Sequence, residues 1–417
     1  MSRGWRNVKA LALVAALVLT GGIATAIDLT DNGGRYAEAN GFIPTPGNTR
    51  FLNSMAGDNY ANVMGSSISV QREFRRALPS IYSYSQTAHY QNRADAAVSS
   101  GDALANVETT AIDATNYYVV CPTTMCSPGS KWVMWDVPFM TNETQKMDDG
   151  YLGYRQTTSG FATGISRMLG ETSAIGLAVG YDGRKMKGRD GYHSKNNADT
   201  FHAALYGGTN IGHFFIDGYA GFSRSWNRSE RDIYNGPAAI QRNKANYNDT
   251  VLSAGLKVSY VWILPSDVRI TPSVGADFSH VRSGSFREKS NQAAAPLLRA
   301  DSSSYSTLAV PIMVSANKTF SSCFLAFGGH NSLWTPEVRG GYVPQFGSKR
   351  ADVDMQVIGT NNKYNAKSAK FTGSYGTAGA GMKLKLRDKY IFAVDYDFIF
   401  GSNYTNHSLT AMYGVSF

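Results

Sequence analysis

Long hydrophobic runs are missing from most of this 417-residue chain. After residue 26, no uninterrupted apolar stretch approaches the roughly 18–20 residues that a membrane-spanning helix needs, and the mean hydropathy is −0.26. Charged residues are also scarce, at 17% of the chain. The formal net charge of +9 is spread over loop-like stretches such as 183–197 and is not gathered in a basic helix. These features exclude a helical membrane protein and argue against nucleic-acid binding.

Cysteine and histidine are few as well, with three Cys and seven His. Their spacing matches neither a zinc site nor a nucleophilic-cysteine constellation, and no G-x-S-x-G motif occurs. We therefore expect no metal, no cofactor and no catalytic residues. Cys121 and Cys126 lie five positions apart in the turn-like stretch CPTTMCSPG. In an oxidising compartment they are candidates for a small disulfide loop, with two free thiols as the alternative.

Glycine and aromatic residues are abundant, at 42 Gly, 24 Tyr and 20 Phe. A chain of this kind without long apolar runs fits two classes of protein. One is a large soluble all-β protein, and the other is a membrane barrel whose apolar residues alternate with polar ones along each strand.

The first 26 residues have the pattern of a secretory signal peptide. Arg3, Arg6 and Lys9 form a positive N-terminal region, 11–19 is a short apolar core, and 24–26 is an A-x-A cleavage site. A membrane anchor is the alternative, but this apolar core is too short to cross a bilayer. We expect export through the Sec translocon and a mature chain that starts at Ile27.

From about residue 131 to the end, a unit of alternating apolar and polar residues followed by a turn or a polar loop repeats along the chain. In 250–262, for example, Leu252, Leu256 and Val258 share one face and Ser253 and Lys257 share the other. Twelve strands are predicted in this way, near 131–139, 155–169, 173–186, 199–210, 213–226, 250–263, 267–281, 304–319, 332–346, 373–387, 390–400 and 408–417.

Two features favour a membrane barrel over a soluble sheet. The apolar faces end in aromatic residues, as expected where strands leave the hydrocarbon layer. The connections also alternate in length: those after strands 1, 3, 5, 7 and 9 are long and polar, such as 227–249 and 282–303, and those after strands 2, 4, 6 and 10 are tight. The eighth connection (320–331) is too long for this rule and the eleventh is too short. The fold class predicted is all-β, a twelve-stranded antiparallel transmembrane β-barrel.

An even number of strands places both ends of the barrel on the periplasmic side, and a lumen of this size holds roughly one helix. Mixed charges in the lumen could pair with each other, hydrate a pore or hold a plug, and a solvated wall is the simplest interpretation. The residues predicted to face the lumen include Lys257, Arg269, Asp277, Glu337, Arg339, Lys383, Lys385, Arg387, Asp395 and Asp397.

Residues 27–130 show no repeat and form a short passenger or linker segment that is partly helical. Two stretches, 59–78 and 92–114, are predicted to be helical. The second is rich in small residues and would span roughly 30 Å at 1.5 Å per residue, so it is the candidate for a helix inside the lumen. An ordinary periplasmic or disordered segment fits 92–114 equally well.

The region 132–417 resembles the autotransporter β-domain, the translocator of type V secretion. The resemblance rests on GFATGISRMLGETSAIGLAVGYDGRKM, FIDGYAGFSRSW, WTPEVRGGYVPQFG and, most specifically, the closing YDFIFGSNYTNHSLTAMYGVSF. It implies an outer-membrane barrel that lets its own N-terminal segment reach the cell surface. It also implies a last-strand signal for the barrel-assembly machinery within 410–417, carried by Thr410, Tyr413, Val415 and Phe417. Met412 departs from the glycine usual in this family.

Three functions compete at this point. The first is a non-enzymatic translocator that exports or displays its own short N-terminal segment. The second is a barrel without a passenger, acting as a small plugged pore or surface protein. The third is a membrane-embedded enzyme, which the sequence disfavours because neighbours His407 and Ser408 point to opposite faces of one strand. The expected partners are the lipid of the outer membrane and, during biogenesis, the Sec translocon and the barrel-assembly machinery, with no nucleic acid. The barrel is expected to be monomeric, and any partner at the cell surface stays open.

Overall fold

The computed structural model describes residues 29–45, 48–79, 132–169, 172–189, 194–235, 238–292, 295–327, 330–370, 373–386 and 390–417. The predicted signal peptide 1–26, the candidate lumenal helix 92–114 and the pair Cys121 and Cys126 lie outside these ranges, so they stay predictions. Among the described helices, none is both long enough and apolar enough to cross a membrane.

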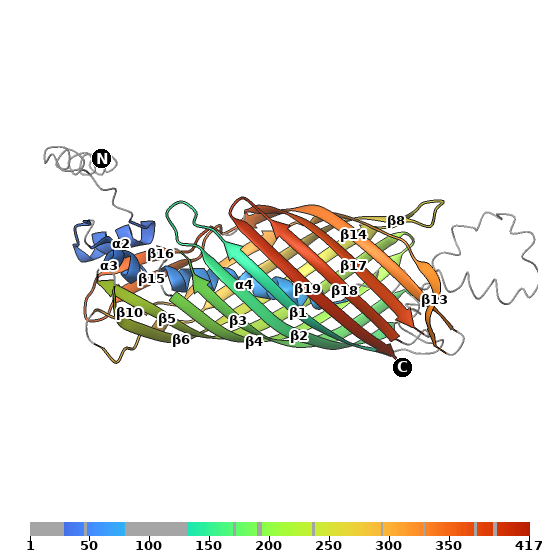
Figure 1. Cartoon of the computed structure of the whole chain (residues 1–417), viewed down its shortest axis with the longest axis horizontal. Coiled ribbons are helices and arrows are strands. Elements are labelled where there is room, and N and C mark those ends of the chain that lie inside the picture. The colour runs from blue at the N-terminus through green and yellow to red at the C-terminus, as the bar shows by residue number, and fades with distance from the viewer. Residues whose placement is uncertain are drawn as a thin grey trace, which may run out of the picture.

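Twelve antiparallel barrel strands close into a barrel, as predicted (Figure 1). The first and last strands pair directly, with Val133 opposite Ser416 and Gln145 opposite Tyr404, so the sheet has no free edge. Two of the barrel strands consist of two segments each, β6 with β7 and β11 with β12. In order around the barrel, the strands are β1 (Trp132–Gln145), β2 (Tyr154–Leu169), β3 (Ser173–Gly188), β4 (Ser194–Ile211), β5 (Phe214–Asn235), β6 (Ala238–Tyr260) continued by β7 (Trp262–Ile263), β8 (Arg269–Ser283), β11 (Ser303–Ala309) with β12 (Ile312–Asn317), β14 (His330–Gly347), β17 (Ser374–Leu386), β18 (Tyr390–Phe400) and β19 (Tyr404–Ser416).

The alternation read from the sequence sets which side chains face outward. In β6, Leu252 and Leu256 are more than half exposed on the outer surface, whereas Val251 and Ser253 are buried on the inner one. The outer surface of the barrel is therefore apolar over its middle, where it would meet lipid, and the inner surface is largely polar.

The two ends of the barrel differ. Trp132 at the start of β1 and Phe417 after β19 are hydrogen-bonded to each other and mark the termini end. Tight turns such as Gly212–His213 also lie there. Apart from the eighth connection, which lies at the termini end, the long connections gather at the opposite end, which we call the loop end (Figure 1).

Several strands extend farther than the sequence predicted. The prediction that 227–249 forms a polar loop is wrong, because β5 and β6 continue through this stretch as a paired hairpin. Its residues are mostly polar on both faces, with inward Ile233, Ala245 and Tyr247 as exceptions that join the main apolar core, so the alternation by which a strand is recognised is weak. The eighth barrel strand is divided by Val310 and Pro311 into β11 and β12. The long eighth connection contains β13 (Phe320–Phe327), which pairs with the start of β14.

A second, four-stranded sheet covers part of the loop end, and we call it the loop sheet. It consists of β9 (Phe286–Arg287), β10 (Leu298–Ala300), β15 (Asp352–Val357) and β16 (Lys363–Lys367). Residues 29–57 pack against it through α2 (Asp31–Asn40) and α3 (Thr49–Met55), and we call this segment the N-terminal cap.

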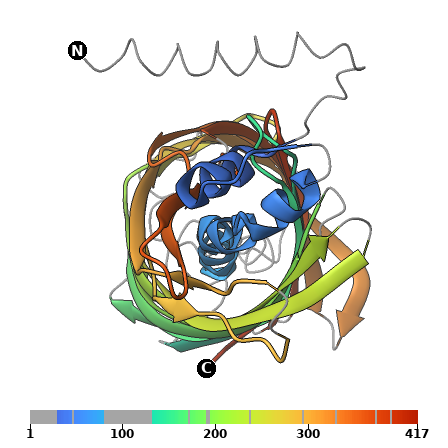
Figure 2. The same ribbon diagram turned by 90° about the vertical axis from the view of Figure 1, so that its left-hand side faces the viewer.

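The third helix, α4 (Asp58–Ala77), enters the barrel from the N-terminal cap and runs toward the termini end (Figures 1 and 2). The helix predicted at 59–78 is thus confirmed, and it is this helix that occupies the lumen. The main apolar core of the protein joins the cap, the start of α4 and the loop sheet; it includes Tyr36, Leu52, Met64, Leu298 and Met355.

Candidate functional site: the filled lumen and its cap

The lumen helix begins and ends where the local sequence requires. Gly57 adopts a φ of 73°, a left-handed conformation that suits glycine, and this turns the chain from α3 into α4. Asp58 in the first turn and Arg75 and Arg76 in the last turn match the helix dipole. The helix stops before Pro79, which disfavours helical backbone at Leu78.

Small and polar side chains cover the middle of α4, and they bond to the barrel wall. Ser67 Oγ donates to Asp249 Oδ2 at 3.1 Å, and the Arg184 guanidinium donates to Ser66 Oγ at 3.0 Å. Asn227 Nδ2 also donates to Asp249 Oδ2, at 2.8 Å. All five residues are buried, so the helix is held by a connected polar network.

One turn farther on, Gln71 and Phe74 fix the rotation of the helix. Gln71 Nε2 donates to Ser253 Oγ at 2.7 Å, and Gln71 Oε1 accepts from Ser223 Oγ. The Phe74 ring is fully buried and stacks on the His202 ring at a centroid distance of 4.5 Å. These contacts join one face of α4 to the neighbouring strands β4, β5 and β6, so the helix cannot rotate without breaking them.

The end of α4 is joined to the last strand through Glu73. Ser408 Oγ and Asn406 Nδ2 donate to the Glu73 carboxylate at 2.8 and 3.3 Å. Arg76 lies 3.1 Å from the same carboxylate, and Arg72 donates to the Tyr404 hydroxyl. The strand predicted to carry the assembly signal is therefore also the strand that binds the lumen helix.

A cavity of about 420 Å³ lies beside the end of α4, toward the termini end. Arg75 forms an ion pair with Asp277 across it, and Arg339 contacts Asp395 at 2.7 Å and Asp397 at 2.9 Å. The charged side chains predicted to face the lumen that line this cavity are Lys257, Asp277, Glu337, Arg339, Lys383, Asp395 and Asp397. Arg269 and Lys385 are buried, and Arg387 lies outside the described residues.

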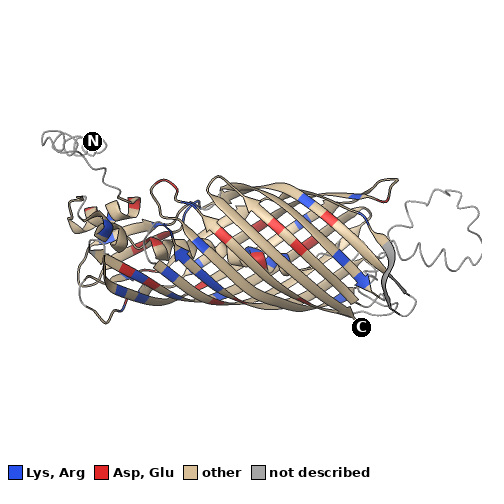
Figure 3. Cartoon of the chain, in the orientation of Figure 1, with Lys and Arg blue, Asp and Glu red and all other residues tan. Residues whose placement is uncertain are grey.

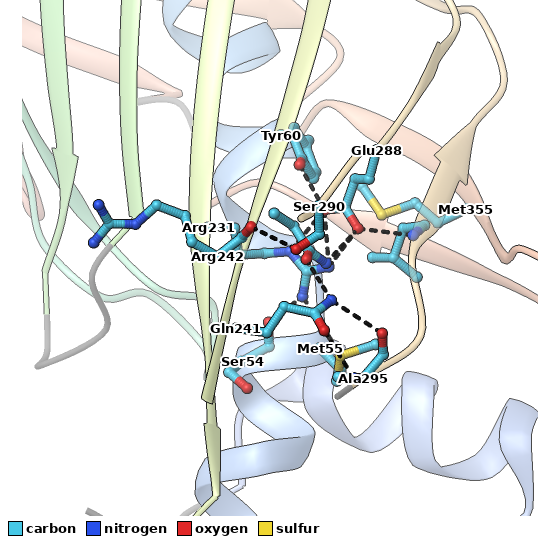
Figure 4. Close-up of polar contacts among 12 residues, drawn as sticks. Ser54, Met55, Tyr60, Arg231, Gln241, Arg242, Glu288, Ser290, Ala295 and Met355 are labelled. Carbon is cyan, nitrogen blue, oxygen red and sulfur yellow. Dashed lines mark hydrogen bonds and ion pairs between the residues drawn. The ribbon is translucent and has the colours of Figure 1, made fainter. Parts of the chain in front are cut away.

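At the loop end, a buried ion pair joins the barrel wall to the loop sheet and the helices (Figure 4). Both Arg231 on β5 and Glu288 after β9 are nearly inaccessible, at 4% and 0% side-chain exposure, and they contact through two nitrogens at 2.8 to 3.0 Å. Tyr60 of α4 donates its hydroxyl to Glu288 at 2.6 Å, and Arg231 donates to the Ser54 carbonyl of α3. The Leu298 amide also donates to Glu288, at 2.7 Å. We call these residues the cap lock.

A second buried carboxyl, Asp58, stands where the cap meets α4. Burial raises the pKa of Asp58 to about 7, although the hydrogen bond from Asn32 at 2.7 Å opposes this shift. Among the described residues, its other oxygen has no hydrogen-bond partner. Ionisation of Asp58 would leave a poorly solvated charge under the cap, so the cap is more stable with this carboxyl protonated.

The last-strand residues singled out from the sequence divide between the two faces of the wall. Thr410 lines the lumen cavity, whereas Tyr413 and Phe417 are exposed on the outer surface, and Val415 lies on that same face. Ser408 points inward and His407 outward, where its ring contacts Tyr396. The structure does not bring His407 and Ser408 together.

Sequence reasoning missed the parts that fill the barrel. It offered 92–114 as a candidate lumenal helix, which lies outside the described residues, did not place 59–78 in the lumen, and singled out none of Asp58, Arg231 and Glu288. A usable signal was present: 59–71 combines a helical pattern with small and polar residues such as Ala61, Gly65 and Ser66, which suit a narrow polar lumen. The partners of Arg231 are far away in sequence, so no local pattern could have revealed the cap lock.

Comparison with known proteins agrees with this geometry. Outer membrane protein A of Rickettsia rickettsii is 25% identical over 166 residues, covering 38% of this chain and 7% of that protein. Its counterpart from Rickettsia conorii is 24% identical over 166 residues, covering 38% and 8%. The chain thus matches less than a tenth of the length of these relatives.

Among solved structures, the translocator domain of the autotransporter NalP from Neisseria meningitidis has the same fold. It superposes with a TM-score of 0.53 at 15% identity, covering 79% of this chain and 95% of that domain. The autotransporter β-domain family matches residues 134–397, which is more than half of the chain. The chain therefore belongs to the autotransporter β-domain family of outer-membrane translocator barrels.

Proposed function

We propose that this protein is a non-enzymatic translocator that carries its own short N-terminal segment to the cell surface and keeps it there as a fixed cap. The single observation that carries the proposal is the direction of α4. The helix starts in the N-terminal cap at the loop end and runs down the lumen toward the end where β1 and β19 have their termini (Figure 1).

In bacterial barrels of this kind, short turns face the periplasm and long loops face outward. The termini end, with its tight turns, then faces the periplasm, and the loop end faces the exterior. A chain whose residues 29–57 lie at the loop end, while β1 begins at the termini end, must pass through the barrel once. α4 is the segment that makes this passage.

Retention of the segment is supported by its packing. Ser54 of the cap accepts a hydrogen bond from buried Arg231 through its carbonyl, and Asn32 bonds to both Asp58 and the Lys367 backbone. The cap also contributes Tyr36 and Leu52 to the main apolar core. A segment joined to the barrel in this way would be displayed at the surface, and it would not be released.

Assembly in the membrane follows from the same proposal. Export through the Sec translocon would deliver the chain to the periplasm, and the barrel-assembly machinery would act on Thr410, Tyr413, Val415 and Phe417. The outward-facing Tyr413 and Phe417 are accessible for such recognition, at 38% and 58% exposure. Closure of β19 against β1 would then fix α4 in the lumen through Ser408 and Glu73.

The test is the accessibility of three epitope tags on intact cells. One tag is placed directly after Asp28, one at the β5–β6 hairpin tip near Asn235, and one in the Gly212–His213 turn. We expect antibodies to reach the first two tags and not the third, with all three accessible after the outer membrane is permeabilised.

Labelling of the hairpin tag alone would overturn the proposal. The N-terminal segment would then be inside the lumen or the periplasm, and the protein would be better described as a plugged barrel. Labelling of the Gly212–His213 tag on intact cells would contradict the orientation itself.

A further inference from the structure

On one side of the barrel, the strands continue well beyond the apolar belt. Outward-facing Phe161, Tyr181 and Phe201 lie side by side on β2, β3 and β4 and mark the upper edge of that belt. Toward the loop end, these strands and the β5–β6 hairpin extend by several more residue pairs. The outward positions of this extension are rich in Lys and Arg (Figure 3).

One row of this extension is nearly all basic, and we call it the basic row. Strand register places six outward side chains directly beside one another, each the partner of the next: Arg155, Lys187, Lys195, Glu230, Lys244 and Lys289. The row lies six residues along the strands from the aromatic row of Phe161. At roughly 3.3 Å per residue and a tilt near 45°, each residue of the row on β2 to β6 lies about 14 Å nearer the loop end than the residue of the Phe161 row on its own strand.

Like charges directly opposite each other on a sheet are destabilising. The row has three such pairs, between Arg155 and Lys187, Lys187 and Lys195, and Lys244 and Lys289. Glu230 compensates only in part, through Lys244 at 3.4 Å. Within the described part of the chain, neither Arg155, Lys187 nor Lys195 forms an ion pair, and all three are exposed.

The basic surface continues on both flanks of the row. Nearer the membrane, Lys185 and Arg228 face outward, and Arg224 stands in the aromatic row itself beside Phe201. Toward the loop sheet, Arg287 and Arg299 are direct cross-strand partners, again with like charges opposite. On each of these strands the positive side chains therefore lie at or beyond the edge of the apolar belt toward the loop end, where a lipid headgroup lies.

On one flank the basic surface ends at β2. Strand β1, which pairs with β2, and the next strands, β19 and β18, contain no Lys or Arg along their described lengths. The basic surface is thus localised to β2–β6 and the adjoining part of the loop sheet. A bound anionic partner at this side would neutralise the row.

We propose that the basic row binds the phosphate groups of a phosphorylated glycolipid headgroup in the leaflet at the loop end. Phosphate oxygens accept charge-assisted hydrogen bonds from Lys and Arg, and basic clusters beside membrane spans bind lipid headgroups in this way. A glycolipid that carries two phosphates would contact neighbouring cations of the row with its headgroup. Its acyl chains would lie on the apolar outer surface of β2 to β6.

The experiment uses the full chain purified in a non-ionic detergent and titrated with bisphosphorylated lipid A. The variant is R155Q/K187Q/K195Q, and the matched control is R167Q/K318Q, which removes exposed or half-buried cations near the termini end. A charge-conserving variant, K187R/K195R, checks that substitution alone does not abolish binding. Dephosphorylated lipid A and inorganic phosphate are titrated in parallel.

We expect wild type, the control and K187R/K195R to bind bisphosphorylated lipid A, with a raised melting temperature. The triple variant is expected to bind about 100-fold more weakly, because each basic side chain contributes about 1 kcal/mol near an anionic surface and 1.4 kcal/mol is tenfold. Without lipid, the triple variant is expected to melt at or above the wild-type temperature, since its like-charge repulsion is gone.

Equal binding by wild type and the triple variant would overturn the proposal, as would equal binding of dephosphorylated lipid A. Saturation of the same shift by inorganic phosphate at similar concentrations would assign the row to a free anion and would also overturn the headgroup. None of these measurements depends on which side of the membrane the N-terminal cap occupies.

Discussion

The cap lock offers the sharpest test of how the N-terminal cap is held. Replacement of Arg231 by Met removes the guanidinium and keeps much of the side-chain volume. Glu288, with a fully buried side chain, would then retain only the hydrogen bonds from Tyr60, Asn243 and the Leu298 amide. The loss of one partner from a buried ion pair destabilises by about 3–5 kcal/mol, because the other charge stays buried and uncompensated.

This penalty should act locally, on the opening of the cap, because the barrel strands are paired around a closed ring. At 1.4 kcal/mol per factor of ten, the population of the open cap should rise by about 140- to 4,000-fold. Hydrogen exchange of amides in α3 and the start of α4, measured in detergent micelles, reports this population directly. Amides in β18 and β19 serve as the internal reference and should be unchanged.

Two further variants make the measurement decisive. Arg228→Leu removes an ion pair on the same strand, with Asp199, whose side chains are 64% and 36% exposed, and exposed pairs contribute about 0–1 kcal/mol, so little change is expected. Adding Glu288→Gln to Arg231→Met removes the isolated charge and keeps one acceptor oxygen, so part of the protection should return. Equal exchange in Arg231→Met and Arg228→Leu would refute the reasoning.

Three other predictions concern the junction and the helix. The pKa of Asp58 is raised to about 7 in the folded protein against 3.8 for an ordinary Asp, so the cap should lose stability as the pH rises from about 4 to 7. Protease cleavage of the cap should therefore be faster at pH 8 than at pH 5 in wild type, and this difference should be absent in Asp58→Asn. Gly57→Ala should destabilise the cap by about 2–4 kcal/mol in thermal melts, since a Cβ there would meet Met355 at a left-handed φ, whereas Gly41→Ala, with open space around it, should cost only about 1 kcal/mol. Phe74→Ala should lower the free energy of unfolding by about 3–5 kcal/mol and should increase amide exchange in 66–77 and current fluctuations in planar bilayers. Unchanged exchange and unchanged currents would contradict the role of Phe74 in fixing the helix in the lumen.

The barrel could be predicted from the sequence because a strand shows its two faces locally. Alternation in segments such as 250–262 gives the apolar outer face and the polar inner face without knowledge of the neighbours. The inward positions of Asp277, Arg339 and Asp395 followed from the same rule and are confirmed. The rule failed at 227–249, where the outward positions and most of the inward positions are polar, so the apolar–polar alternation is weak.

The contents of the lumen could not be predicted in the same way. Both 59–78 and 92–114 have helical patterns, and length and small side chains favoured the second. What holds α4 in place is a set of contacts with residues more than a hundred positions away, such as Ser67 with Asp249 and Glu73 with Ser408. Only the closed barrel brings these partners together.

By itself, then, the sequence determined the class of the protein, the number of its barrel strands and which side chains face inward, since these depend on periodicity within each strand. The tertiary structure alone decided which helix fills the lumen, where the N-terminal cap lies, and that Arg231 and Glu288 hold it. The basic row likewise arises only from strand register, because its six residues are scattered from 155 to 289 and become neighbours when β2 to β6 pair. Contacts of this kind are non-local, and one chain read residue by residue does not contain them in any recognisable pattern.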